Sequence, residues 1–480
     1  MRDRATSTPR RLSVASGGFA WLLLWMAFSS LWGIPHGGPS AVSAQEPLWG
    51  EALTAKIDSL AEGTLAESPV AAVGIGVKRG QDLLLARGYG LADVENRVPA
   101  DAETVYRIGS ITKQFTAAAI MRLVEQGRIG LDDPMTEYLP DYPTQGHEVT
   151  VRHLLTHSSG IKSYTSLEAW RPVMRLDLTH QELLAHFQDE PFDFAPGERF
   201  LYSNSGFYLL GMIVEEVSGT SYPDYLDAHL FEPLGLSGSS YCHERLIIPG
   251  RAEGYEVEDG ELVNDEPISM NQPGAAGALC STVPDLLVWS DALRTGRVVA
   301  RNSYRQMTTP GTLNDGSATS YGFGLMLGEL EGHARIGHGG GIPGFNAVLT
   351  HYPDADLDIV VLSNTNGAHP GRIEETVARW ALGIDVPVVR DEALAAGETE
   401  TYVGVYELRP GFELTISVRD GQLMSQATGQ PGFRLRAQGD HVFIPTFDDN
   451  VRVEFSVDGN RAESLVLYQA GQEIEARRVR

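Results

Sequence analysis

Residues 110–125 read Ser-Ile-Thr-Lys-Gln-Phe-Thr-Ala-Ala-Ala-Ile-Met-Arg-Leu-Val-Glu, a stretch that carries a helix signal and a chemical one. Its apolar residues recur at helical spacing, and Gly127 follows where a helix end is expected. Ser110 and Lys113 lie three residues apart, so a helix brings both side chains to one face. The positive end of the helix dipole disfavours the ammonium form of Lys113. A hydroxyl beside a neutral amine has the composition of an activated nucleophile with its own base.

The Ser-x-x-Lys pattern alone has low specificity, because Ser159-Gly-Ile-Lys162 matches it as well. The context of the two matches differs. The segment His157-Ser-Ser-Gly160 around the second serine predicts a turn, whereas Ser110 opens a long helical pattern. We therefore predict that Ser110 is the nucleophile.

Two further segments supply groups that an acyl-transfer site needs besides its nucleophile. Tyr202-Ser-Asn204 precedes an apolar helix predicted over 206–217. A nearby cation such as Lys113 would lower the pKa of the Tyr202 phenol and make it a general base. Asn204 can hydrogen-bond the Lys113 amine and a substrate amide. Taken alone, this segment also fits a core tyrosine followed by a helix cap.

The other segment is Gly337-His338-Gly-Gly-Gly341, just before a strand predicted over 347–350. Its glycines allow close approach of the backbone, so a strand edge there can bind substrate. His338 can donate to a substrate carboxylate or help set the Tyr202 proton. An ordinary surface loop is the alternative. His153 and His157 lie four apart, as metal ligands can, but the leucines between them favour a structural role.

The order of predicted elements indicates two domains in the 480 residues. Strands are expected near both ends of the first domain, with helices between them, which favours one sheet with a helical insertion. Short alternating strands separated by turn signals follow near the C-terminus. The predicted boundaries are 45–388 for the first domain, 389–400 for a linker and 401–480 for an all-β domain.

The N-terminus has the layout of a secretory signal, with arginines, a short apolar run over 19–28 and small residues up to Ala44. The run is short for a membrane anchor, which is the alternative. We predict a cleaved signal peptide over 1–44, export to the periplasm or the medium, and no stable membrane insertion after cleavage.

Charge and cysteine content limit the partners. The chain carries a formal charge of −26, and because residues 1–44 contribute +3, the remainder carries −29. Such acidity without a basic patch argues against nucleic-acid binding. Cys242 and Cys280 are too few for a zinc-thiolate site, and they can form a disulfide or stay as two buried thiols.

The segments Ser110-x-x-Lys113, Tyr202-x-Asn204 and His338-x-Gly340 occur in that order at wide spacing. Together with Leu154-Leu-Thr-His-Ser-Ser-Gly160 and Phe194-Ala-Pro-Gly, they resemble the serine β-lactamase-like superfamily. The resemblance covers about residues 71–382 and is to the class C branch and its related DD-peptidases. The C-terminal module resembles the lipocalin-like β domain often appended to this family.

The resemblance implies an α/β fold, a β-lactamase/transpeptidase-like sandwich of an antiparallel sheet and helices with an all-helical subdomain, followed by a small β-barrel-like domain. It implies that Ser110 is acylated, that Lys113 and Tyr202 share the proton transfers, and that Asn204 positions Lys113 and substrate. The N–H groups of Ser110 and Gly341 would form the oxyanion hole. No metal or cofactor is expected.

One motif departs from class C β-lactamases, which carry Lys-Thr-Gly where this chain has His338-Gly-Gly340. Gly339 replaces a hydroxyl that would contact a substrate carboxylate, and a His there resembles DD-peptidases, D-aminopeptidases and some esterases. We expect an exported serine hydrolase acting on a D-amino-acid peptide, of carboxypeptidase or peptidase type, or on a small ester. The alternatives are an esterase, a weak β-lactamase, or a penicillin-recognising binding or sensor protein with little turnover.

Overall fold

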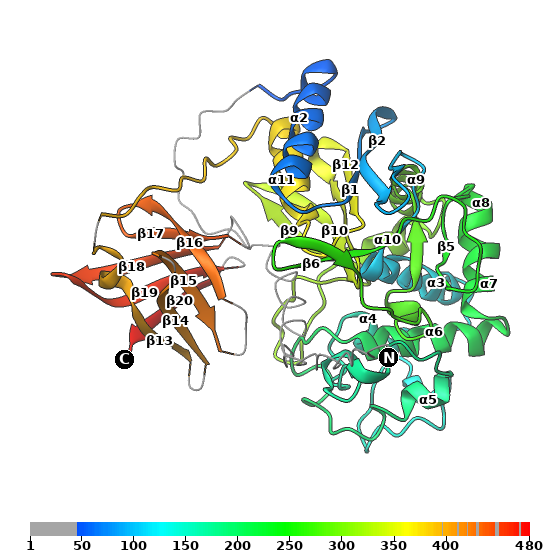
Figure 1. The fold of residues 1–480 in the computed structure, drawn as a ribbon. Helices are drawn as coiled ribbons and strands as arrows, with labels where there is room; N and C mark the ends of the chain where they lie inside the picture. Colours follow the sequence, from blue (N-terminus) through cyan, green and yellow to red (C-terminus); the bar gives the residue numbers. More distant parts are fainter. Residues whose placement is uncertain are drawn as a thin grey trace, which may run out of the picture.

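The computed structural model describes residues 46–480 except residues 396, 410–411, 420, 429–431, 447–450 and 470–471. The predicted signal peptide, 1–44, lies outside the described residues. Among those described, no helix combines the length and the apolar character needed to cross a membrane. The chain forms an α/β unit that ends with α11 (Pro370–Leu382), followed by a β-barrel (Figure 1).

The α/β unit is built on one seven-stranded antiparallel sheet. In spatial order its strands are β3 (Val98–Pro99), β2 (Asp82–Asp93), β1 (Ala72–Arg79), β12 (Leu357–Ser363), β11 (Phe345–Tyr352), β10 (His333–Ile342) and β9 (Met326–Leu330). The first and last strands of the unit meet in the middle of the sheet, where Val73 of β1 lies opposite Ser363 of β12. The sheet is therefore assembled from both ends of the unit, as the sequence predicted.

Helices cover both faces of this sheet. The branched side chains of β1 pack with α2 (Glu51–Glu67) and α11 in one apolar cluster, and these two helices lie together over the sheet in Figure 1. On the other face, α9 (Val283–Thr295) approaches two glycines of β1. A Cβ atom at Gly76 would lie 2.5 Å from Val283, so this close packing requires glycine.

The helical part lies between β3 and β9 in the sequence. Its remaining helices are α3 (Thr112–Glu125), α4 (Val151–Leu155), α5 (His180–Leu184), α6 (Asn204–Ser218), α7 (Tyr222–Leu226), α8 (Glu232–Leu234) and α10 (Arg301–Met307). Its short strands are β4 (Tyr106–Arg107), β8 (Leu279–Ser281) and β5 (Ser240–Tyr241) in one sheet, and β6 (Tyr255–Glu258) with β7 (Glu261–Asn264) in another. Helix α3 is buried over most of its length and packs against α6. The predicted fold class is confirmed.

Beyond α12 (Thr399–Tyr402), eight strands close into a barrel. They are β13 (Gly404–Arg409), β14 (Phe412–Arg419), β15 (Gln422–Ala427), β16 (Gly432–Gly439), β17 (Val442–Pro445), β18 (Arg452–Asp458), β19 (Arg461–Gln469) and β20 (Gln472–Arg478). The sequence predicted five of them, over 413–418, 422–426, 441–446, 452–457 and 464–468, and missed β13, β16 and β20. Strand β20 is mostly polar, so it is defined by pairing with both neighbours rather than by an apolar pattern. The expected linker contacts the barrel, because Glu392 donates its N–H to Ala437.

Candidate active site

Ser110 lies in a 3-10 turn, Gly109–Ile111, that leads directly into α3. Lys113, in the first turn of α3, is fully buried, and its Nζ lies 3.0 Å from Ser110 Oγ. The structure thus brings together the two residues that the sequence singled out. The second Ser-x-x-Lys match forms no such pair: Lys162 makes an ion pair with Asp193, and Ser159 Oγ accepts the N–H of Ile161.

The surroundings of Lys113 favour a neutral amine. Burial lowers the pKa of Lys113 well below its usual value. Its Nζ also lies 2.9 Å from Asn204 Oδ1 and 2.7 Å from the carbonyl oxygen of Ala276. Both oxygens can only accept, so they take the two hydrogens of a neutral amine. The lone pair is then left for the Ser110 hydroxyl, which is the geometry of a base.

Tyr202 faces the same pair, but its acidity differs from the expectation. Lys113 Nζ lies 4.8 Å from the centre of the Tyr202 ring. Burial raises the pKa of the phenol above its usual value, and a hydrogen bond with Ser110 only partly opposes this. The pKa of Tyr202 is thus raised rather than lowered as expected, because burial dominates it and also disfavours the charge on Lys113. The phenol therefore keeps its proton in the free protein.

Asn204 is oriented by its own contacts. It begins α6, and Ser203 caps this helix by accepting the N–H of Gly206. The Asn204 side-chain amide donates to Thr165 Oγ1 at 3.0 Å, so its oxygen is directed at Lys113. The Asn204 backbone N–H donates to Ser163 Oγ. This arrangement fits the positioning role expected for Asn204.

Both ring nitrogens of His338 are engaged within the protein. Nδ1 donates to the carbonyl of Gly339, and Nε2 lies 2.9 Å from the Tyr321 hydroxyl, which donates to it. Burial, with the nearby Lys113, lowers the pKa of His338 to about 3. A neutral ring with these partners offers neither a charge nor a ready donor to a substrate carboxylate, unlike one of the two expectations. Tyr321, which the sequence did not single out, fixes this state.

The glycine-rich run is part of a strand rather than a loop. Strand β10 pairs with β11 along its whole second half, but β9 pairs only up to Gly337. The following residues have an open edge on that side, beside the turn that holds Ser110. A Cβ at Gly340 would lie 2.0 Å from the carbonyl oxygen of Ile108, and one at Gly109 would lie 2.7 Å from the backbone nitrogen of Gly341. Glycine is therefore required for this contact, which brings the two expected oxyanion-hole segments together.

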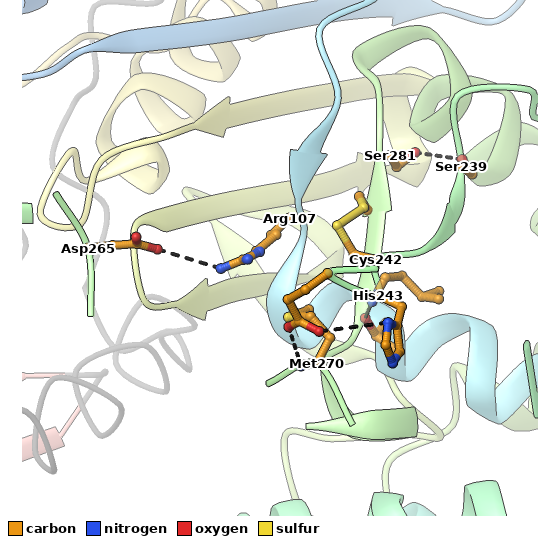
Figure 2. Close-up of a disulfide and its surroundings, with 11 residues drawn as sticks. Arg107, Ser239, Cys242, His243, Asp265, Met270 and Ser281 are labelled. Atoms are coloured by element: carbon orange, nitrogen blue, oxygen red, sulfur yellow. Dashed lines mark hydrogen bonds and ion pairs between the residues drawn. A yellow bond between two sulfur atoms is a disulfide. The ribbon is translucent and has the colours of Figure 1, made fainter. Parts of the chain in front are cut away.

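Cys242 and Cys280 form a disulfide, which resolves the two alternatives left open by the sequence. Cys280 lies on β8, opposite Arg107 of β4. Strand β4 ends just before the Gly109–Ile111 turn that holds Ser110. Figure 2 shows the disulfide near Arg107, which makes a 3.5 Å ion pair with Asp265. The bridge therefore ties the small sheet together next to the active-site turn.

His153 and His157 do not form a metal site. His153 caps α4, where its Nδ1 accepts the N–H of Thr150, and His157 contacts Tyr202 instead. Among the residues that the structure describes, no group of three or more His, Cys, Asp or Glu side chains is arranged to hold a metal ion. Sequence reasoning missed the contact of His157 with Tyr202, although it had noted the surrounding Leu154–Gly160 segment.

A buried Ser–Lys pair at a helix start, faced by a phenol, an amide and an open strand edge, defines a serine hydrolase site. The chain belongs to the Beta-lactamase family, whose model matches residues 57–383. A second family model, described as a domain of unknown function (DUF3471), matches residues 391–478 and so covers the barrel.

The chain is similar to penicillin-binding proteins and to D-aminopeptidases. Penicillin-binding protein 4* of Bacillus subtilis (strain 168) is 27% identical over 427 residues, which are 84% of this chain and 93% of that protein. A D-aminopeptidase of Brucella anthropi is 28% identical over 317 residues, 65% of this chain and 59% of that one. The solved structure of an octameric penicillin-binding protein homologue from Pyrococcus abyssi has a TM-score of 0.65 at 28% identity, covering 88% of this chain and 100% of that one.

Proposed function

We propose that this protein is an exported serine hydrolase that cleaves the amide of a D-amino-acid peptide or amide through an acyl-enzyme at Ser110. The observation that carries the proposal is the buried Lys113 amine, with both of its hydrogens taken by carbonyl oxygens and its lone pair left for Ser110. Such a pair needs no separate histidine base.

The reaction follows from these positions. Lys113 accepts the Ser110 proton as Oγ bonds to the substrate carbonyl carbon, and the N–H groups of Ser110 and Gly341 stabilise the oxyanion. Tyr202, which keeps its proton, gives it to the leaving nitrogen as the amide bond breaks, and regains one from Lys113. A water molecule then attacks the ester carbon and gives one proton to Lys113, which passes it to Ser110 Oγ as the ester bond breaks and the acid leaves.

The state of His338 favours a leaving group without a free carboxylate. Its pKa is lowered and both of its nitrogens have partners, so the third motif supplies no cation for a carboxylate. This shifts the proposal from the carboxypeptidase type toward an aminopeptidase or amidase, in line with the similarity to a D-aminopeptidase. Small esters are the second substrate class that we propose, and β-lactams are poorer candidates.

The proposed export has two supports. The N-terminal sequence has the layout of a secretory signal. The disulfide between Cys242 and Cys280 is of the kind that persists in oxidising compartments outside the cytosol.

The test is a panel of D- and L-aminoacyl amides, D-alanyl-D-alanine peptides and short-chain esters, with Ser110→Ala as the control. We expect Ser110-dependent turnover of D-aminoacyl amides above that of carboxylate-bearing peptides. Turnover that survives Ser110→Ala would refute the mechanism. Intact mass after incubation with benzylpenicillin separates the remaining alternatives: a lasting Ser110-dependent adduct without turnover of any panel member would indicate a sensor, and hydrolysed drug a β-lactamase.

A further inference from the structure

His157 has an uncommon backbone conformation for a residue that is not glycine. It is buried, and its φ is +55°, in the left-handed region. A side chain with a Cβ atom pays a conformational cost there, and such residues persist only where the surrounding structure holds them. His157 lies two residues after the end of α4, and its ring contacts Tyr202 of the predicted site.

His157 makes hydrogen bonds to the residue before Tyr202 and to the residue after it. Its carbonyl oxygen accepts the N–H of Leu201 at 2.9 Å, and its Nδ1 accepts the N–H of Ser203 at 3.1 Å. Its ring lies on the ring of Tyr202, with centroids 4.2 Å apart and planes tilted by 35°. The tyrosine is thus held through the backbone before it, the backbone after it and its own ring.

The other ring nitrogen of His157, Nε2, lowers the stability of the folded protein. Because Nδ1 accepts a hydrogen bond, Nε2 carries the hydrogen, and this buried atom has no hydrogen-bond partner among the described residues. A buried donor without a partner lowers stability. A left-handed backbone and an unpaired N–H at one residue are together poorly explained by packing, since an apolar side chain would avoid the second cost.

We propose that His157 is a positioning residue that fixes the Tyr202 phenol against Ser110, an inference that rests on the proposed acyl-enzyme mechanism. His157 does not carry protons itself, because burial and the nearby Lys113 lower its pKa well below the usual value. It acts by holding the Leu201–Ser203 backbone and by limiting rotation of the Tyr202 ring. Ring contacts with Phe207 and Tyr321, at 5.0 and 4.6 Å between centroids, keep His157 in place.

Two substitutions separate its contacts. His157→Asn tolerates the left-handed backbone and keeps a short acceptor, but removes the ring, whereas His157→Phe keeps a ring and removes the acceptor. We expect each to lower kcat for a D-aminoacyl amide by about 10- to 100-fold, because small misplacement of a catalytic group costs this much. KM should change by less than about 3-fold, since the contact matters in the transition state.

A double-mutant cycle shows whether the effect passes through Tyr202. In a Tyr202→Phe background there is no phenol to position, so His157→Asn should change kcat by less than about 2-fold. A merely structural role would lower kcat by the same factor in both backgrounds. The matched control is His153→Asn, which alters the other histidine whose Nδ1 accepts a backbone N–H, and should leave kcat and KM unchanged.

The outcomes are distinct for the inference and for the proposed function. If Ser110→Ala is inactive but folded His157→Asn keeps the wild-type kcat, or if its loss is equal in both backgrounds, the inference is wrong and the function stands. If Ser110→Ala keeps its turnover, the function itself is wrong. Should His157→Phe fail to fold, His157→Asn carries the test alone.

Discussion

A single buried amine sets the chemistry of this site. Lys113 is held by carbonyl oxygens of Asn204 and Ala276, which lie 91 and 163 residues away in the chain. Each contact is an ordinary hydrogen bond, but together with full burial they favour the neutral form. A lysine at the same position on an exposed helix would be an ammonium ion and could not accept the Ser110 proton.

Lys113→Arg tests this directly. A guanidinium cannot lose its proton in a protein, so it cannot act as the base. We expect kcat/KM to fall by about 10²- to 10⁴-fold, the usual contribution of a general base. Lys162→Arg, at the second Ser-x-x-Lys match, keeps the ion pair with Asp193 and should leave kcat/KM unchanged. Equal losses in the two variants would contradict the assignment.

At the scale of elements, strand β10 places an open strand edge next to the turn that holds Ser110. Its glycines let the strand lie against the Gly109–Ile111 turn, and β9 stops early enough to leave an open edge there. The same residues that weaken a strand by lacking side chains make this contact possible. The edge and the nucleophile are therefore placed by one contact between two backbones.

Gly340→Ala should disturb that contact. The added Cβ would lie 2.0 Å from the carbonyl oxygen of Ile108, so β10 must move away from the turn. We expect a loss of about 1–3 kcal/mol in unfolding free energy and about 10²-fold in kcat. Gly63→Ala is the control: its Cβ meets nothing within 4 Å in α2, so stability should rise by up to about 1 kcal/mol with kinetics unchanged. Unaltered kinetics in Gly340→Ala would refute the requirement for glycine.

The disulfide stabilises the small sheet next to the same turn. It joins residues 38 positions apart, and a loop of that size predicts a stabilisation of about 4 kcal/mol. The double variant Cys242→Ala with Cys280→Ala should therefore unfold at a lower urea concentration than the wild type. Adding a reductant should shift the wild type toward the variant and leave the variant itself unchanged. Coincident unfolding curves without reductant would show that β4, β8 and β5 hold together without the bridge.

At the scale of the whole molecule, the stability of this acidic chain depends on carboxyl groups whose pKa values burial raises. The part of the chain after residue 44 carries a formal charge of −29. Some of its carboxyl groups are buried: Glu374 on α11 accepts a hydrogen bond from Tyr352, and burial raises its pKa to about 7. Burial raises the pKa of Glu256 to about 7 as well. The folded protein thus holds protons that the unfolded chain would release.

This difference predicts how stability depends on pH. Between about pH 4.5 and 7 the folded state binds more protons than the unfolded state at these groups, so the unfolding free energy falls as pH rises through this range. Glu374→Gln keeps an acceptor for Tyr352 and should flatten the decline by on the order of 1–3 kcal/mol. Thermal unfolding at pH 5 and 7.5 measures it, with exposed Glu62→Gln as control. An unchanged slope in Glu374→Gln would contradict the expected role of its carboxyl group.

The sequence by itself determined the elements with local patterns. Helical spacing after Ser110 predicted α3, short apolar runs over 71–77, 83–89, 347–350 and 359–363 predicted β1, β2, β11 and β12, and the order of the three motifs indicated the family before any geometry was known. These signals are local because backbone preference and side-chain periodicity depend on near neighbours in the chain. The polar strand β20 lacked such a signal and was missed, and the glycine-rich part of β10 was expected only as a strand edge, with a surface loop as the alternative.

Only the tertiary structure decided the chemical state of the site. The lowered pKa of Lys113, the raised pKa of Tyr202 and the position of the His338 ring between Tyr321 and Gly339 all depend on burial and on tertiary contacts. The contact of His157 with Tyr202 and the bridge between Cys242 and Cys280 join residues 38 or more positions apart. The physical reason is that pKa values and close contacts are set by distance and desolvation in space, which the order of residues does not specify.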